Sequence, residues 1–274
     1  MLRLCRPYYG VPMALTYLLT VYYAAGGEMT GAWAGALVST LALLLVIAGG
    51  YVLNDVCDAE VDRVNAPARP IPSGRVGRKA AGVLAAALLA GGLGAAAACR
   101  WQYLAALSAV AGGLVAYDIL SKRIGPAKQV VVAVLMTSIY PLALAQAGGP
   151  TGPRAWALAA FPAWLLPTAF GYELLKDLRD AAGDRRAAPR QTRVQRRPLL
   201  MRRVAAAVIV AAAPLLLLPG WLGCKWVYLI GASCAIVLAA ASAFAPVRRA
   251  IRLIYFECLL AALAAAADAL ILGM

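Results

Sequence analysis

The 274-residue sequence contains no histidine, and this absence excludes several functions at once. Histidine is the usual acid–base group near neutral pH and the commonest ligand for haem, copper and catalytic zinc. The six cysteines form no Cys-x-x-Cys pair, which argues against a disulfide framework or a zinc site and favours small apolar fillers. Any catalytic metal should therefore be bound by oxygen ligands.

Acidic residues are also scarce, with 12 against 26 lysines and arginines and a net charge of +14. Eight of the 12 acids fall in two short stretches, residues 54–62 and 173–184. A chain this basic could bind nucleic acid, but no recognised reader motif or base-stacking platform accompanies the charge. We therefore expect no nucleic-acid partner, and we look to the two acidic stretches for chemistry.

Apolar residues make up 63% of the chain, more than one water-soluble core could bury. Because about 20 helical residues cross the hydrocarbon layer, the long apolar runs with little or no charge predict nine transmembrane helices. The fold expected is an all-α membrane protein, with the nine helices in one bundle and a single domain over residues 1–274. The predicted spans are 11–25, 33–53, 80–99, 103–120, 129–147, 155–175, 204–219, 226–244 and 253–272.

The first predicted span is the least regular. Tyrosines such as Tyr17 and Tyr22 make it amphipathic, and Pro7 and Pro12 could bend its start. A basic residue, Arg6, precedes it, as in a signal peptide, but the tyrosines and prolines favour a mature helix.

Basic residues divide unevenly between the two sides of the membrane. With the N-terminus in the cytoplasm, nine spans place 23 of the 26 in cytoplasmic segments and leave Arg100, Arg154 and Lys225 outside. Lysine and arginine accumulate in cytoplasmic loops, and they also attract anionic headgroups. The sequence predicts a multi-pass integral membrane protein with membrane lipids as partners and with its N-terminus and acidic stretches on the cytoplasmic side.

The two acidic stretches share one spacing, in which three aspartates are separated by three and then four residues. On a continuing helix such residues share a face, where their charges repel unless a divalent cation neutralises them. Oxygen ligands alone suit Mg²⁺, which also bridges to substrate phosphates. Alternatively, each trio is a solvated helix end paired with arginines, but the repeated spacing favours the metal. The predicted metal ligands and catalytic residues are Asp55, Asp58, Asp62, Asp177, Asp180 and Asp184.

Two other residues near the trios, Asp118 and Tyr172, can each be interpreted in two ways. For Asp118 we favour a helix cap over a place in the site, and for Tyr172 an interfacial position over one facing a substrate cation. Basic residues in these loops could hold a diphosphate through charge-assisted hydrogen bonds. The candidates are Arg63, Arg69, Arg75, Lys122, Arg123, Lys128, Lys176 and Arg179.

Three strings of residues resemble known motifs. Residues 54–62 fit N-D-x-x-D-x-x-x-D, residues 69–74 read R-P-I-P-S-G, and residues 176–184 fit K-D-x-x-D-x-x-G-D. On these strings the chain resembles, over nearly its whole length, the UbiA superfamily of intramembrane prenyltransferases, and looks most like its digeranylgeranylglyceryl phosphate synthase branch. The resemblance implies a central lateral cavity open to the cytoplasmic face and a magnesium-dependent transfer of a prenyl group from a prenyl diphosphate donor, with release of diphosphate. The residues expected to bind substrate are Asn54, Arg69, Tyr117, Lys122, Lys128 and Lys176.

The identity of the acceptor is the least specified part of this expectation. The chain departs from the pattern of many members at Tyr8 to Gly10 and at Ala127-Lys128, positions that surround the substrates. The acceptor expected is a lipid resembling geranylgeranylglyceryl phosphate. An aromatic acceptor, such as 4-hydroxybenzoate or a quinone precursor, and a terpene cyclase of the same superfamily remain alternatives. A lipid carrier or transporter is disfavoured, because Glu257 and Asp268, the acids inside the last span, lie toward its ends.

Overall fold

The computed structural model describes residues 1–26, 29, 31–120, 127–149, 156–187 and 197–272, with the backbone alone for residues 65, 182–187 and 272. All regular secondary structure in these ranges is helical, which confirms the predicted fold class. The helices are α1 (Pro7–Ala24), α2 (Trp33–Cys57), α3 (Ala59–Asn65), α4 (Arg78–Ala96), α5 (Trp101–Leu120), α6 (Ala127–Thr137) and α7 (Ile139–Ala147). They continue with α8 (Ala157–Ala187), α10 (Pro198–Ala212), the 3₁₀ turn η2 (Ala213–Leu217), α11 (Leu218–Trp221), α12 (Trp226–Phe244) and α13 (Val247–Leu272).

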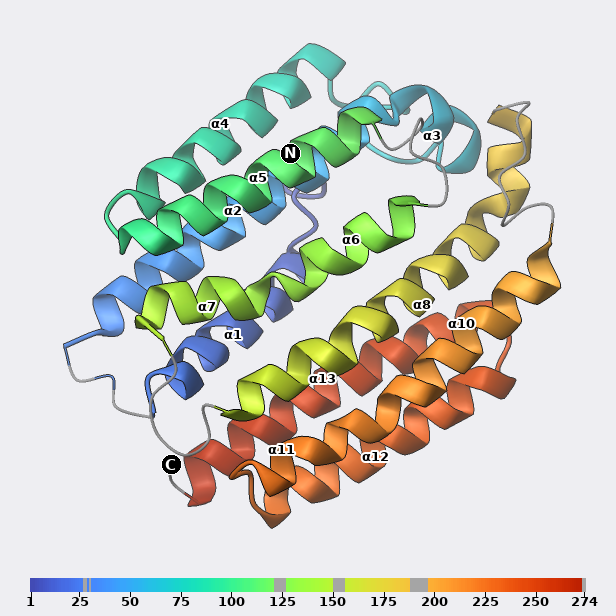
Figure 1. Ribbon diagram of the computed structural model, residues 1–274. Helices are drawn as coiled ribbons and strands as arrows, with labels where there is room; N and C mark the ends of the chain where they lie inside the picture. Colours follow the sequence, from blue (N-terminus) through green and yellow to red (C-terminus); the bar gives the residue numbers. More distant parts are fainter. Residues whose placement is uncertain (27–28, 30, 121–126, 150–155, 188–196, 273–274) are drawn as a thin grey trace.

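The long helices lie side by side in one bundle (Figure 1). In this view α2, α4 and α5 form one side and α10 and α12 the opposite side, while α1, α6, α7, α8 and α13 lie between them. The short helix α3 lies at one end of the bundle, where it packs against α8. The second half of the chain therefore returns beside the acidic stretch of the first half.

Eight helical segments within the described ranges are long and apolar enough to span a membrane. They coincide with the predicted spans from 33–53 onward. The first predicted span, 11–25, is helical as α1 but is not among the eight, in keeping with its tyrosines and prolines. The helix packs against α2 and α7 and buries Tyr17 and Tyr23. The ninth span therefore stays a prediction.

One of the spans is broken where the sequence predicts a continuous helix. Between α6 and α7 the helix stops at Thr137 and restarts at Ile139. Pro141 has no N–H to donate to the carbonyl of Thr137 four residues earlier, so the regular hydrogen-bond ladder cannot continue there. On either side of the break, α6 packs mainly against α8 and α7 mainly against α1. Together the two helices are long and apolar enough to form one span of 21 residues.

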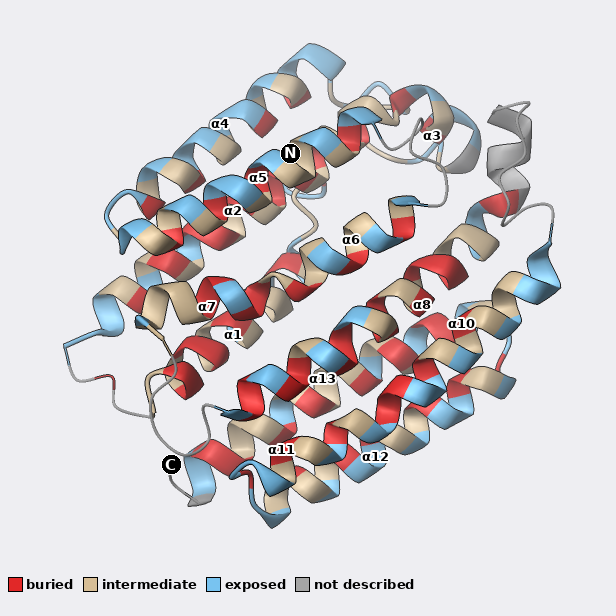
Figure 2. Cartoon of the chain, in the orientation of Figure 1, coloured by how far each residue is buried: buried red, intermediate tan, exposed pale blue. Residues whose placement is uncertain are grey.

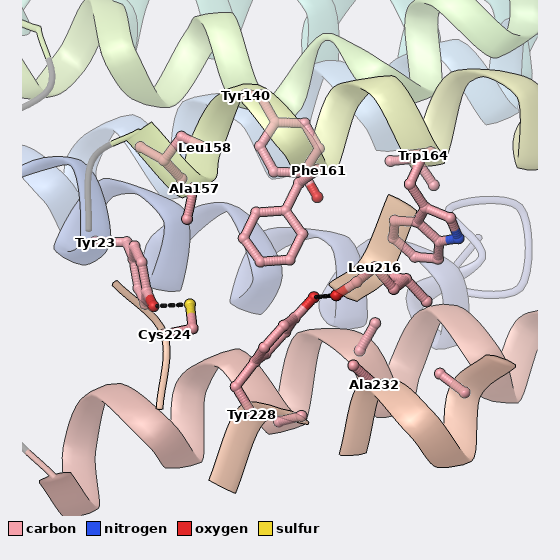
Figure 3. Packing of buried hydrophobic residues seen from close by; sticks show 14 of the residues in the cluster. Tyr23, Tyr140, Ala157, Leu158, Phe161, Trp164, Leu216, Cys224, Tyr228 and Ala232 are labelled. Atoms are coloured by element: carbon pink, nitrogen blue, oxygen red, sulfur yellow. Dashed lines mark hydrogen bonds between the residues drawn. The ribbon is translucent and has the colours of Figure 1, made fainter. Parts of the chain in front are cut away.

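Burial identifies the middle of the bundle. In the most apolar part of α8, 61% of residues are buried, against 22% in α4; Figure 2 shows the same contrast between the two helices. Aromatic rings from several helices meet in this interior (Figure 3). The ring of Phe161 stacks on Tyr140 with 6.0 Å between centroids and meets Tyr228 edge-on at 5.8 Å. The hydroxyl of Tyr228 donates to the backbone oxygen of Leu216 over 2.7 Å, which ties α12 to η2.

The two acids of the last span differ from each other in position. Asp268 lies near the end of α13, where its carboxylate accepts hydrogen bonds from the backbone N–H groups of Lys225 and Tyr228 and so caps α12. Glu257 is the eleventh residue of α13, because that helix begins at Val247 and not at the predicted Leu253. The expectation that both acids lie toward the ends of the span is therefore wrong for Glu257.

Candidate active site

A cavity of about 1520 Å³ runs through the middle of the bundle. The described lining comes from the segment before α1, from α1, α2, α3, α5, α6, α7, α8 and α13, and from the loop after α3, and none of it comes from α4, α10 or α12. Along α8 the lining extends from Leu158 to Asp180, about 33 Å at 1.5 Å per helical residue. The cavity therefore connects the acidic end of the bundle with its aromatic interior. From the two predicted trios, Asp55, Asp58, Asp62, Asp177 and Asp180 all line it.

The first trio does not lie on one continuous helix, as the sequence analysis assumed. Helix α2 ends at Cys57 and α3 begins at Ala59, and Asp58 between them has φ −93° and ψ 7°. The backbone N–H of Asp58 still donates to Asn54, and that of Asp62 to Asp58, each over 2.8 Å. The chain thus changes from α2 to α3 at Asp58, and these two hydrogen bonds join the two helices across the junction.

Arg69 joins two members of the first trio. Its Nη1 atom lies 2.5 Å from an oxygen of Asp62 and 3.5 Å from an oxygen of Asp55. Burial raises the pKa of the Asp62 carboxyl above its ordinary value, and the neighbouring Arg69 guanidinium opposes that rise. One arginine therefore compensates two carboxylates that would otherwise repel each other beside the cavity.

Arg6, which the sequence analysis did not include among the site residues, also binds Asp55. It donates a charge-assisted hydrogen bond to that carboxylate, and its guanidinium lies 5.1 Å from the centre of the Tyr51 ring. Its φ of 45° places it in the left-handed region, a conformation that costs about 1–3 kcal/mol for a residue other than glycine. The ion pair and the aromatic contact hold the residue there, so the start of α1 is fixed against the acidic end of α2.

The second cluster is held from α6. Lys128 donates to one oxygen of Asp177 over 2.7 Å, and Gln129 donates to the other over 2.6 Å. Both donors line the cavity, Lys128 as predicted and Gln129 as an addition that its sequence context did not signal. Arg179 binds the neighbouring Asp180 in a two-pronged pair of 2.7 and 2.8 Å. The carboxylates of α8 are thus oriented by side chains from two elements.

Asn54 and Asp118 link α2 to α5. The side-chain amide of Asn54 donates to Oδ1 of Asp118 over 3.1 Å, and Oδ2 of Asp118 is buried without a hydrogen-bond partner. Both residues line the cavity, as does Tyr117. The preferred reading of Asp118 as a helix cap is therefore wrong, because its carboxylate faces the site and binds a side chain of another helix.

Lys176 and Tyr172 lie one turn apart on α8, and both line the cavity. Lys176 donates to Glu173 over 2.7 Å, and its ammonium lies 5.6 Å from the centre of the Tyr172 ring. The favoured interfacial position of Tyr172 is wrong, because the ring belongs to the cavity wall. A half-buried aromatic face at this point can stabilise a positive charge.

Two candidate phosphate binders lie away from the cavity. Arg63 is exposed and pairs with Glu60, and Arg75 is exposed and binds Ser73 and the backbone oxygen of Ala68. Neither belongs to the described lining. Three further predicted side chains lie outside the described residues: Lys122, Arg123 and Asp184.

The donor atoms suit Mg²⁺ in a shared site. Among the described residues, no group of three or more histidine, cysteine, aspartate or glutamate side chains is placed to hold a metal ion by itself. Mg²⁺ commonly uses one or two carboxylates together with water and substrate phosphate. Carboxylates from α2, α3 and α8 face one cavity, and basic residues there could bind the same anion. The residues therefore fit an ion shared with an anionic ligand better than an ion enclosed by protein alone.

Comparisons with known proteins agree with this arrangement. A model of the UbiA prenyltransferase family matches residues 13–255. The digeranylgeranylglyceryl phosphate synthase of Methanoculleus marisnigri is 37% identical over 183 residues. That alignment covers 67% of this chain and 63% of the relative, so the match spans a little less than two thirds of the relative's length.

Two solved structures share the fold. A UbiA homologue from Aeropyrum pernix K1 has a TM-score of 0.76 and 16% identity, covering 98% of this chain and 99% of its own. A UbiA homologue from Archaeoglobus fulgidus, bound to GPP and Mg²⁺, has a TM-score of 0.68 and 15% identity, covering 100% of this chain and 99% of its own.

Proposed function

Because the chain belongs to the UbiA prenyltransferase family, we propose that it transfers a prenyl group from a prenyl diphosphate to a lipid acceptor resembling geranylgeranylglyceryl phosphate. One observation carries this proposal. Two aspartate clusters, from the two halves of the chain, line one cavity whose other walls are apolar and aromatic. Such a cavity offers carboxylates for the diphosphate end of a donor and a hydrocarbon environment for its chain.

The carboxylates and the basic residues have separate roles in this proposal. The six motif aspartates, including Asp184, would hold Mg²⁺, which when bound neutralises diphosphate charge and favours its departure. Arg69, Lys128 and Lys176 line the cavity and would bind the remaining anionic oxygens, with Lys122 as a further candidate. These fixed charges stabilise the diphosphate as the bond to the allylic carbon breaks.

The aromatic residues act on the other side of that bond. As the diphosphate leaves, the allylic carbon gains positive charge, which the rings of Tyr172 and Tyr117 at the cavity wall can stabilise. Asn54 would orient a substrate oxygen beside the first cluster. The oxygen of an acceptor hydroxyl then attacks the carbon and loses its proton, which an oxygen of the released diphosphate can accept. The apolar wall excludes the water that would compete with the acceptor.

The nature of the acceptor is supported by the relatives. The name of the Methanoculleus marisnigri relative supports a lipid acceptor, and the GPP and Mg²⁺ bound to the Archaeoglobus fulgidus homologue support the donor class and the cation. An aromatic acceptor is the second candidate, because Tyr8 to Gly10 and Ala127-Lys128 differ from the usual family residues. We place the acidic end of the bundle and the N-terminus in the cytoplasm, since 23 of 26 basic residues fall on that side.

One experiment separates these possibilities. The purified protein is given labelled geranylgeranyl diphosphate and Mg²⁺, with geranylgeranylglyceryl phosphate or 4-hydroxybenzoate, and the products are identified by mass. We expect diphosphate release and a prenylated lipid product, both abolished by EDTA. The variants D58A and D180A should lose turnover while remaining folded in the membrane. Near-normal activity in either variant would rule out the assigned clusters, and uptake of prenyl diphosphate without any release would indicate a carrier.

A further inference from the structure

A buried glutamate holds a tryptophan of the cavity wall. The indole Nε1 of Trp164, on α8, donates a hydrogen bond of 2.9 Å to Oε1 of Glu257, on α13. Trp164 lines the cavity, whereas Glu257 is fully buried behind the wall, between the lining residues Ile254 and Ala261 of its own helix. Glu257 therefore contacts the cavity through another residue.

Burying this carboxyl group inside a membrane-spanning helix is energetically unfavourable. The second carboxyl oxygen of Glu257, Oε2, is buried without a hydrogen-bond partner, and no described residue forms an ion pair with this side chain. An apolar residue at position 257 would avoid the cost of burying an acid inside a span. A buried indole N–H does need an acceptor, however, and Glu257 supplies it. The acid is thus best explained by what it does for Trp164.

The position of Trp164 along α8 gives that contact a consequence for substrate. Trp164 precedes Asp177 by 13 residues, which is about 20 Å along the helix. Beyond it, Phe161 and Leu158 continue the lining toward the start of α8. A prenyl chain whose diphosphate lies at Asp177 would meet the indole with its far end. Because the lining continues past Trp164, a longer chain would have to run along the indole to reach Phe161 and Leu158. The hydrogen bond to Glu257 fixes the indole at that point, and moving the indole aside would leave two buried polar groups unpaired.

We propose that Glu257 is a positioning residue whose hydrogen bond fixes the indole of Trp164, and that Trp164 held in this way limits the length of the prenyl chain the cavity accepts. The inference rests on the proposed function, because it concerns the donor of that reaction. It makes Trp164 the residue that meets the hydrocarbon and Glu257 the residue that keeps it in place.

The test compares donors of two, three, four and five isoprene units at saturating Mg²⁺ and acceptor. In wild type we expect kcat/KM to fall sharply at one length. E257Q keeps an acceptor oxygen for the indole and should keep that length preference. E257L removes the acceptor and should raise kcat/KM for the longest donor, relative to the preferred one, by about tenfold, the discrimination typical of a small change in an apolar pocket.

A double variant of Glu257 and Trp164 covers the case in which E257L does not fold. Should E257L fold poorly, the double variant E257L/W164F removes both polar partners and should fold, since replacing both partners is often nearly neutral. It should show the same relaxed preference as W164F alone, because the two residues act as one unit. If E257L lowers kcat/KM equally for every donor, the inference is overturned and Glu257 has a structural role alone. Wild type that releases no diphosphate from any donor would refute the proposed function itself.

Discussion

The side chain of Asn54 donates a hydrogen bond to Asp118 over a distance of 3.1 Å. Asn54 lies beside Asp55 in the last turn of α2, and Asp118 lies near the end of α5. The contact fixes the first aspartate motif relative to a helix that carries no motif aspartate. Because Asp118 has a second, unpartnered oxygen facing the same cavity, its effect on the reaction can be tested directly.

We expect D118A to lower turnover by about tenfold while the protein remains folded. The substitution leaves the half-buried amide of Asn54 without its acceptor, a loss of about 1–3 kcal/mol that loosens the first motif. D118N is the matched control, since it keeps an acceptor oxygen in the same place and should stay within about threefold of wild type. Initial rates of diphosphate release measure both. Equal losses in the two variants would show that the charge of Asp118 matters and not its hydrogen bond.

The spacing of the second acidic cluster is a local pattern that can be interpreted from the sequence. Asp177 and Asp180 lie one turn apart on a single helix, so their common side follows from helical periodicity alone. The partners of these aspartates could not be found in that way. Arg6 is 49 residues from Asp55, and Gln129 is 48 residues from Asp177. Such contacts depend on how helices pack, which no local pattern specifies.

The departures from the predicted helices have local causes that are hard to weigh from sequence. Pro141 lies inside a predicted span of uniform hydropathy and breaks it at Ser138, whereas Pro162 and Pro167 lie inside α8 without ending it. Whether a proline ends a helix depends on how neighbouring helices satisfy the freed carbonyl groups. The break at Asp58 has no proline near it, and backbone hydrogen bonds at Asn54–Asp58 and Asp58–Asp62 join the two helices there.

Replacing Arg69 should remove most activity. The residue compensates Asp55 and Asp62 together, so R69A leaves two neighbouring carboxylates without their common partner, and we expect turnover to fall about 100-fold or more. R63A is the matched control from the same segment, because Arg63 pairs with exposed Glu60, and such exposed pairs contribute little. It should keep wild-type rates. Comparable losses in R63A and R69A, at equal yields of folded protein, would contradict the assigned role of Arg69.

The acid limb of the pH profile should depend on Asp62. Burial raises the pKa of this carboxyl, so it keeps its proton to a higher pH than an exposed aspartate, whose pKa is about 3.9. A protonated carboxyl binds cations poorly, so kcat/KM should decline with falling pH earlier than an ordinary aspartate would require. Arg69 lowers this pKa, and R69A should therefore move the limb to still higher pH. The measurement is kcat/KM as a function of pH, for wild type and for the residual activity of R69A. Acid limbs that superimpose in the two proteins would contradict the assignment of this limb to Asp62.

The packing of α2 against α4 offers a test of the scaffold that holds the first motif. A Cβ atom on Gly92 would lie 2.8 Å from the backbone oxygen of Ala42 and 2.8 Å from a methyl group of Val46, so G92A should force the two helices apart. Overpacking of this kind costs about 1–3 kcal/mol, and we expect a lower thermal midpoint in detergent together with reduced turnover, because α2 carries Asp55 at its end. G94A is the matched control on the same helix, where a Cβ meets nothing within 4 Å. It should be neutral or slightly stabilising, since alanine favours helix over glycine by about 1 kcal/mol. Equal midpoints for the two variants would mean that α2 and α4 do not approach as closely as the structure indicates.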